Sequence, residues 1–187
     1  MAKHLRTNDS FDEFCATLLE EAKRFLEKAD ETSDRAGATA FCHATLNLGI
    51  CAFEAHVNSV AEEFLPRAEL NILEKSILAE ADIDLELGSF KLSSRPRHYR
   101  TLDRYEFLWH RFSKRKLNRN VAWWSRLKEA FRLRDALTHP RTPATVDCEV
   151  TRRSVQAIID ALDALFVAIY RRRCPGAKRG LRSVLSF

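Results

Sequence analysis

Glycine and proline are scarce in this sequence, with only five of each among 187 residues. An all-β fold needs many tight turns, which favour these two residues, so their scarcity argues against that class. Hydrophobic residues make up 45% of the chain and include 12 Phe and 3 Trp, which is enough to form a core. The composition therefore predicts a folded protein and excludes a chain that is disordered throughout.

The spacings typical of metal sites and disulfide frameworks are also missing. The odd number of cysteines shows no CxxC or CxxH spacing; they are Cys15, Cys42, Cys51, Cys148 and Cys174. Such cysteines indicate reduced core residues, so we expect no zinc site, no disulfide and no cofactor. The opening residues lack the apolar region of a signal peptide, and no apolar run approaches the roughly 18 residues of a membrane span. We therefore expect a cytoplasmic protein without a membrane partner.

Charge is divided unevenly along the chain. Residues 1–90 carry 8 basic and 18 acidic residues, whereas residues 91–187 carry 23 basic and 8 acidic residues. One interpretation is that the C-terminal half meets an anionic partner, with nucleic acid as the leading candidate. The alternative is that the two halves neutralise each other within the fold.

Apolar spacing of three and four residues predicts an all-α bundle of about five to six helices. We place the helices at residues 10–30, 34–65, 67–81, 103–116, 120–139 and 151–173. Ser10 to Glu13 has the pattern of a capping box, and Asn118 or Asn120 is expected to cap the fifth helix. Residues 83–100 are expected to form an irregular connection and residues 141–150 a loop. Residues 1–173 would form a single domain, followed by a basic tail at residues 174–187.

The second of these helices carries a polar stripe beside its apolar face. His43, Asn47, Glu54 and Asn58 fall within about 60° of each other around the helix axis. The stripe is either a solvated face or the lining of an internal cleft. In the second case, Glu54 would be a carboxylate partner for an arginine on a neighbouring helix.

An arginine of this kind interrupts the apolar face of the fifth helix. Helical spacing gathers Trp124, Leu127 and Phe131 on one side, and Arg134 projects from the same side. An unpaired buried guanidinium is costly, so Arg134 either pairs with a core carboxylate or faces an anionic substrate in a cleft. Five residues later, Pro140 disfavours helical backbone at His139 and predicts the helix end there.

Arg134, Asp135 and His139 together suggest a chemistry. An arginine can bind phosphate bidentately and stabilise a pentacovalent phosphorus, and a histidine can move the proton of a ribose 2′-OH. These groups would cleave RNA without a metal ion or a covalent enzyme intermediate.

The segment "RDALTHP" at residues 134–140, at the end of a helix that precedes one more long helix, resembles the R-x4-6-H motif of the HEPN superfamily. The resemblance implies a helical bundle, usually a homodimer with two motifs facing each other across a shared cleft. For active members it implies metal-independent endoribonuclease activity, often in toxin–antitoxin or antiviral defence systems. Arg134 would bind the phosphate, His139 would be the catalytic histidine, and Asp135 the polar residue that orients them. Arg132 satisfies the looser x6 spacing, but its place on the polar face makes it second choice.

One feature departs from a HEPN subgroup. Toxins that a partner nucleotidyltransferase silences by AMPylation carry a tyrosine two residues after the histidine, and Arg141 stands at that position here. We therefore expect any antitoxin partner to act in another way.

Further basic and aromatic residues would extend an RNA-binding surface. The candidate phosphate contacts are Arg132, Arg141, Lys114, Arg115, Lys116, Arg119 and Arg171 to Arg173. Solvated helix ends are the alternative interpretation of these residues. Trp109 could stack on bases, whereas Trp123 and Trp124 are expected to face the core. The leading hypothesis is thus a homodimeric HEPN-type endoribonuclease acting on RNA; the alternatives are an RNA- or nucleotide-binding module and a structural adaptor bundle.

Overall fold

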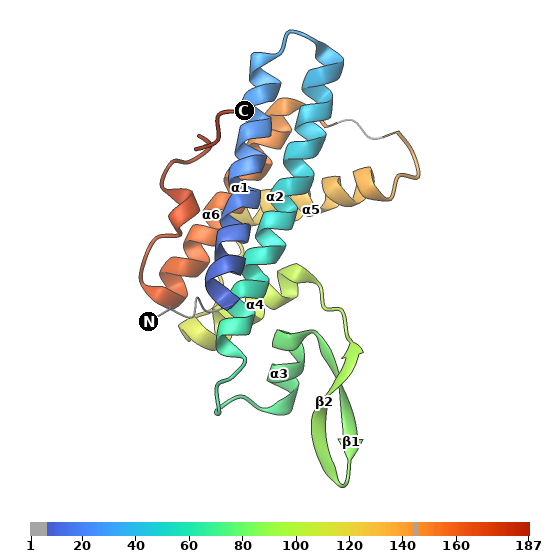
Figure 1. The fold of residues 1–187 in the computed structure, drawn as a ribbon, viewed down its shortest axis with the longest axis vertical. Helices are drawn as coiled ribbons and strands as arrows, with labels where there is room; N and C mark the ends of the chain where they lie inside the picture. The colour runs from blue at the N-terminus through green and yellow to red at the C-terminus, as the bar shows by residue number, and fades with distance from the viewer. Residues whose placement is uncertain (1–6, 144–145) are drawn as a thin grey trace, which may run out of the picture. The chain divides into compact units, whose positions relative to one another are not determined.

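The structure is a computed structural model that describes residues 7–143 and 146–187, and its fold is mostly helical, as expected (Figure 1). The elements in chain order are α1 (Thr7–Glu31), α2 (Arg35–Phe64), α3 (Ile72–Ala79), β1 (Ala81–Glu86), β2 (Ser89–Pro96), α4 (Thr101–Ser113), α5 (Ala122–Thr138), α6 (Cys148–Tyr170) and the 3-10 turn η1 (Pro175–Ala177). The described part of the chain thus contains six α-helices and one small sheet.

Two helices begin elsewhere than their sequence signals suggest. Ser10 lies inside α1, which already begins at Thr7, so its capping-box pattern does not start the helix. Val121 is the N-cap of α5 and makes no side-chain cap hydrogen bond. Neither asparagine caps α5, because the Asn118 side chain instead accepts a hydrogen bond from the backbone N–H of Asn120 at 3.0 Å.

The expectation of an irregular connection at residues 83–100 is wrong. β1 and β2 form an antiparallel hairpin in which Ile83 pairs with Leu92 and Leu85 with Phe90. Leu87 and Gly88 form the two-residue turn with φ of 48° and 77°, the positive values that favour glycine in such hairpins. The alternation of acidic and apolar residues in Ala81–Glu86 already carried this signal, since it has the two-residue period of a strand.

The chain divides into two compact units where the sequence suggested one bundle. Unit 1 comprises Met1–Glu54 and Asn118–Phe187, and unit 2 comprises Ala55–Leu117. Helix α2 contributes to both units, which explains why a single long periodic segment did not reveal the division.

In unit 1, the first part of α2 lies beside α1 and α6, and α5 packs against α6 (Figure 1). Gly49 stands at the close approach of these helices, because a Cβ there would be 3.1 Å from Ile158 of α6 and 4.0 Å from Ala22 of α1. The core contains fully buried leucines and isoleucines from all four helices, including Leu19, Leu46, Leu127 and Leu162.

Residues 174–187 do not form a separate tail. The fully buried Lys23 of α1 donates a 2.6 Å hydrogen bond to the carbonyl oxygen of Gly176. Further along, the backbone N–H of Ser183 donates to Glu27 at 2.9 Å. The segment therefore belongs to unit 1, held by polar side chains of α1 that complement its backbone.

A second correction concerns the cysteines. Cys42 of α2 and Cys148 at the start of α6 form a disulfide across 106 positions of sequence. Cys51, expected in the core, is exposed, whereas Cys15 and Cys174 are buried as expected. Spacing rules missed the pair because its two members are brought together only by helix packing.

Unit 2 is built around a different buried arginine. Arg104 of α4 is 4% exposed and donates to the carbonyl oxygens of Ile77 and Leu78 at 3.2 and 2.9 Å. Its Nη1 also donates to Asn58 at 2.5 Å and to Glu80 at 2.7 Å. Arg104 thereby ties α2, α3 and the base of the hairpin to α4.

By length and composition, α2 would also be long and apolar enough to cross a membrane. This is weak evidence, because core helices of folded proteins pass the same test. In this chain, α2 buries Leu46, Ile50, Phe53, Val57 and Val60 inside the fold.

Candidate functional site

The candidate site lies at the C-terminal end of α5. Leu127 and Ala130 are fully buried on this helix, and Arg134 follows on the same side, as its spacing predicts. The Arg134 side chain is 25% exposed, so it stands at the border between the core and solvent. Its carbon Cζ lies 5.8 Å from the Phe131 ring, which in turn packs edge-on against Phe53 at 5.7 Å. The guanidinium therefore lies next to an aromatic part of the core.

Glu54 of α2 is the carboxylate that pairs with Arg134. The Nη2 atom of Arg134 donates to Glu54 Oε1 at 3.0 Å, and the Glu54 side chain is 34% exposed. The nominated partner is therefore confirmed, but the pair is not enclosed in the core. On the other side, Nε lies 3.3 Å from the carboxylate of Asp135, which is 62% exposed.

Arg134 retains donors for a further ligand. The guanidinium carries five N–H groups, and within the described residues its hydrogen bonding is limited to the Glu54 contact, with the buried Nε left without a hydrogen bond. Two carboxylates thus orient the guanidinium without occupying all of its donors. Such an arrangement can bind a phosphate group or another oxyanion.

His139 lies where α5 ends, as Pro140 predicts. It is the C-cap residue with φ −128° and ψ 59°, and its backbone N–H donates to the backbone carbonyl oxygen of Asp135 at 2.9 Å. The Thr138 hydroxyl donates to the carbonyl of Arg134 at 3.0 Å, which closes the last turn. The side chain of His139 is exposed, so its imidazole is accessible from solvent.

The polar stripe of α2 is divided between the units. Asn58 belongs to unit 2, where its amide oxygen accepts a hydrogen bond from Arg104, so it is committed to that network. His43, Asn47 and Glu54 remain in unit 1 on one face of α2, all half-buried. The Nε2 atom of His43 is buried and has no hydrogen-bond partner among the described residues.

Cys51 is the nearest thiol to this ion pair. Partial desolvation raises the pKa of the Cys51 thiol, and the Glu54 carboxylate raises it further, although Arg134 opposes this effect. Cys51 is therefore a poor nucleophile, and it does not compete with the Arg134 and His139 pair for a chemical role.

The candidate phosphate contacts are divided between the two units. Arg132 is held by Glu129 through two hydrogen bonds of 2.8 and 2.6 Å on the exposed side of α5. Arg141 is exposed two residues beyond His139, and Arg119 is exposed just before α5. Lys114, Arg115 and Lys116 are exposed in unit 2. Of the charged groups after α6, Arg173 pairs with Asp163 at 2.7 Å, whereas Arg171 and Arg172 are exposed at the helix end.

The tryptophans divide between core and surface. Trp124 is 4% exposed, as expected, whereas Trp123 is only half-buried and meets the Trp124 ring edge-on at 5.9 Å. The indole Nε1 of Trp109 is buried without a hydrogen-bond partner in the described part of unit 2. The described geometry therefore offers no exposed tryptophan pair for base stacking.

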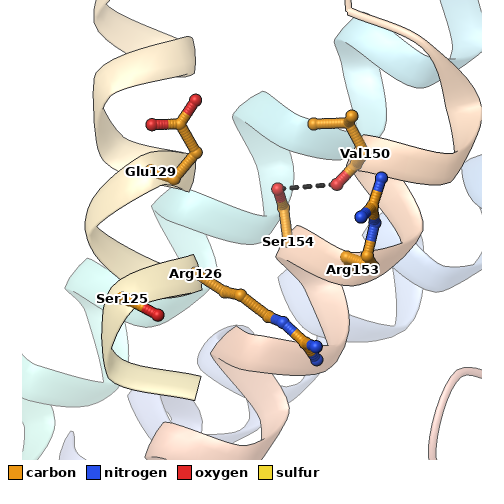
Figure 2. Close-up of a pocket in the computed structure, with 6 residues that line it drawn as sticks. All are labelled: Ser125, Arg126, Glu129, Val150, Arg153 and Ser154. Atoms are coloured by element: carbon orange, nitrogen blue, oxygen red, sulfur yellow. Dashed lines mark hydrogen bonds between the residues drawn. The ribbon is translucent and has the colours of Figure 1, made fainter. Parts of the chain in front are cut away.

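A pocket of about 310 Å³ lies between α5 and α6 (Figure 2). Its lining residues are Ser125, Arg126, Glu129, Val150, Arg153 and Ser154. Figure 2 shows the Arg126 side chain reaching from α5 toward α6. Glu129 pairs with Arg132 and Arg153 with Glu149, which leaves Arg126 as the lining charge without an ion pair among the described residues.

No group of three or more His, Cys, Asp or Glu side chains is placed to hold a metal ion in residues 7–143 and 146–187. The chemistry that the site can offer from its own side chains is anion binding by Arg134 and proton transfer by His139.

In comparisons with known proteins, no family model, curated protein or solved structure matches the chain.

Proposed function

We propose that this protein is a metal-independent endoribonuclease of the HEPN type. The observation that carries the proposal is the state of Arg134, which is held by Glu54 and Asp135 at the border of the core with donors left for a ligand. The exposed His139 ends the same helix five residues later. This pairing of an oriented guanidinium with an accessible imidazole suits cleavage of a phosphodiester with a neighbouring 2′-OH.

In the proposed reaction, Arg134 binds the non-bridging oxygens of the scissile phosphate and stabilises the charge of the pentacovalent phosphorus. The ribose 2′-OH attacks the phosphorus, and the bond to the 5′ oxygen of the next nucleotide breaks. His139 takes part in moving the proton from the 2′-OH to the leaving oxygen. The products are a 2′,3′-cyclic phosphate and a 5′-OH end. Asp135 and Glu54 position Arg134.

The resemblance to HEPN domains also supports a homodimer, in which the motifs of two chains face one RNA phosphate. A second copy would place a second guanidinium at the phosphodiester, which one chain alone does not supply. A toxin–antitoxin or antiviral defence setting, with a protein partner that restrains cleavage, belongs to the same proposal.

The experiment is RNA cleavage by the purified protein in the presence of EDTA. Wild-type protein should cleave and leave cyclic phosphate ends, whereas Arg134→Ala and His139→Ala should each lose activity by at least about 100-fold, the usual contribution of one such group. Lys128→Ala is the control, because Lys128 is an exposed basic residue of α5 that has no assigned role in the site. Circular dichroism should show that all variants are folded. Loss of wild-type cleavage in EDTA, or full activity of both site variants, would overturn the proposal.

A second candidate function is RNA or nucleotide binding without cleavage. The same ion pair favours it, because Glu54 occupies part of Arg134 and would compete with a scissile phosphate. If this function is correct, wild-type protein binds RNA but leaves it intact, and Arg134→Ala weakens binding.

A further inference from the structure

The N-terminal end of helix α6 is held by a buried side chain, a capping hydrogen bond and a disulfide. Val146 is 4% exposed, the Asp147 side chain accepts a hydrogen bond from the N–H of Val150 at 2.7 Å, and Cys148 is bonded to Cys42 of α2. These contacts hold the far end of the connection that starts at His139, with eight residues between His139 and Cys148.

The two sulfurs differ in their access to solvent. Cys42 is fully buried, whereas Cys148 is half-buried at the end of a helix. An oxidant or a thiol therefore reaches Cys148 first, and Cys42 stands behind it as the resolving partner. The three remaining cysteines are poor competitors. Cys15 and Cys174 are buried, and burial raises the pKa of the Cys174 thiol; partial burial beside Glu54 raises the pKa of the Cys51 thiol.

The segments that carry the two sulfurs are packed in the core. Thr151 and Val155, in the turns of α6 that follow Cys148, are fully buried, and so is Cys42. In addition, the Cys148 sulfur lies 3.8 Å from the carbonyl oxygen of Ala38, which can accept a hydrogen bond from a thiol. The Cys148 side chain therefore has a bonding partner in both redox forms: Cys42 in the disulfide and the Ala38 carbonyl oxygen in the thiol.

We infer that Cys42 and Cys148 form a reversible redox modification site: the disulfide links the start of α6 to α2, and reduction removes this link. In the oxidising direction, the Cys148 thiol releases a proton and the thiolate attacks a peroxide oxygen, which gives a sulfenic acid and hydroxide; the released proton converts the hydroxide to one water. The Cys42 thiol then attacks this sulfur, forms the disulfide and releases a second water. Two thiols and one hydrogen peroxide thus give one disulfide and two waters. A dithiol reverses the change by exchange and leaves as its own disulfide.

The test uses the full chain, reduced with a dithiol, freed of reagent and then treated with hydrogen peroxide or buffer. Alkylation and peptide mass spectrometry should find five reactive cysteines in the reduced, denatured protein and three after peroxide, with Cys42 and Cys148 joined. Because the bond closes a loop of more than 100 residues, the oxidised form should melt on the order of 10 °C higher.

Three variants control this measurement. Cys42→Ser and Cys148→Ser should each abolish the peroxide-dependent rise in Tm, and Cys51→Ser should respond like the wild type. The inference is overturned if peroxide joins other cysteines or leaves Cys42 and Cys148 reactive. It is also overturned if a dithiol reduces the pair only after the protein is unfolded, since the bond would then be a permanent cross-link.

One consequence rests on the proposed function. Helix α6 packs against the motif helix α5, so fixing the start of α6 should make the oxidised protein cleave RNA several-fold faster than the reduced protein. Cys148→Ser should cleave at one rate in both conditions. Cleavage that is equal in both redox forms of the wild type would refute this consequence. Absence of cleavage in both forms would instead count against the proposed function, while the thiol and Tm results would still decide the redox site.

Discussion

Two arginines in this chain look alike by residue type but differ in their surroundings. Arg104 is 4% exposed and satisfied by two carbonyl groups, one amide and one carboxylate. Arg134 is 25% exposed and hydrogen-bonded to one carboxylate. A satisfied, buried guanidinium is typical of a structural anchor, whereas a partly exposed one with remaining donors is available to a ligand.

Arg134→Ala should change stability little. Ion pairs with this degree of exposure are screened by solvent, so we expect a loss of about 1 kcal/mol or less in urea unfolding. The matched variant Glu54→Gln should lose a similar amount. A loss of several kcal/mol for Arg134→Ala would show that the arginine serves the core.

Arg104→Ala should be much more harmful. It leaves the carbonyls of Ile77 and Leu78 and the amide oxygen of Asn58 without their donor, and each buried acceptor left unsatisfied costs about 1–3 kcal/mol. Urea unfolding measures the loss, and hydrogen exchange should show that α3 and the hairpin open first. An Arg104→Ala protein as stable as Arg132→Ala would contradict the anchoring role.

At the scale of the element, α3 is short and depends on its cap. Asn71 and Glu74 form a reciprocal capping box with hydrogen bonds of 3.0 Å each, and Glu74 also binds Arg111 at 2.6 Å. The hydrogen bond from the Asn71 backbone and then the bond from Arg111 lower the pKa of Glu74 from its ordinary value of 4.5. The first turn of α3 is therefore held by an ionised carboxylate.

This pKa shift makes part of the stability of unit 2 dependent on pH. Because the folded pKa of Glu74 is lower than its unfolded value, its contribution is present above pH 4.5 and is lost as the pH falls through the folded pKa. Glu74→Gln should remove this part of the acid sensitivity in urea unfolding between pH 3 and 7. Identical pH profiles of wild type and variant would contradict it.

At the scale of the whole molecule, the proposed composite site requires two chains. Light scattering at micromolar concentration should give about twice the 21.6 kDa mass of one chain. Mixing Arg134→Ala with His139→Ala chains should restore part of the cleavage if each site takes groups from both chains. A monomer that still cleaves RNA would contradict the shared site.

Local features of the sequence determined most of the helices. They also showed that Arg134, a charged residue, lies on an apolar helix face. Helical periodicity and the Pro140 signal act within a few residues, so the placement of Arg134 on an apolar face and the end of α5 at His139 could be predicted. The pairing with Glu54 could be nominated, because Arg134 interrupts an apolar face and Glu54 lies in the polar stripe of another helix. The hairpin could also have been predicted from its alternating pattern and its Leu87-Gly88 turn.

Tertiary structure alone decided which distant groups meet. Three contacts join segments far apart in sequence: the Cys42–Cys148 bond, the hydrogen bonds of Arg104 in α4, and the packing of the last residues onto Lys23. The division of α2 between two units also appears only in the folded chain. Periodicity states which face of a helix is buried but not which helix covers it, or at what height. The packing of whole helices therefore determines which distant residues contact each other. It also determines whether an arginine on an apolar face is buried in the core or partly exposed at its border.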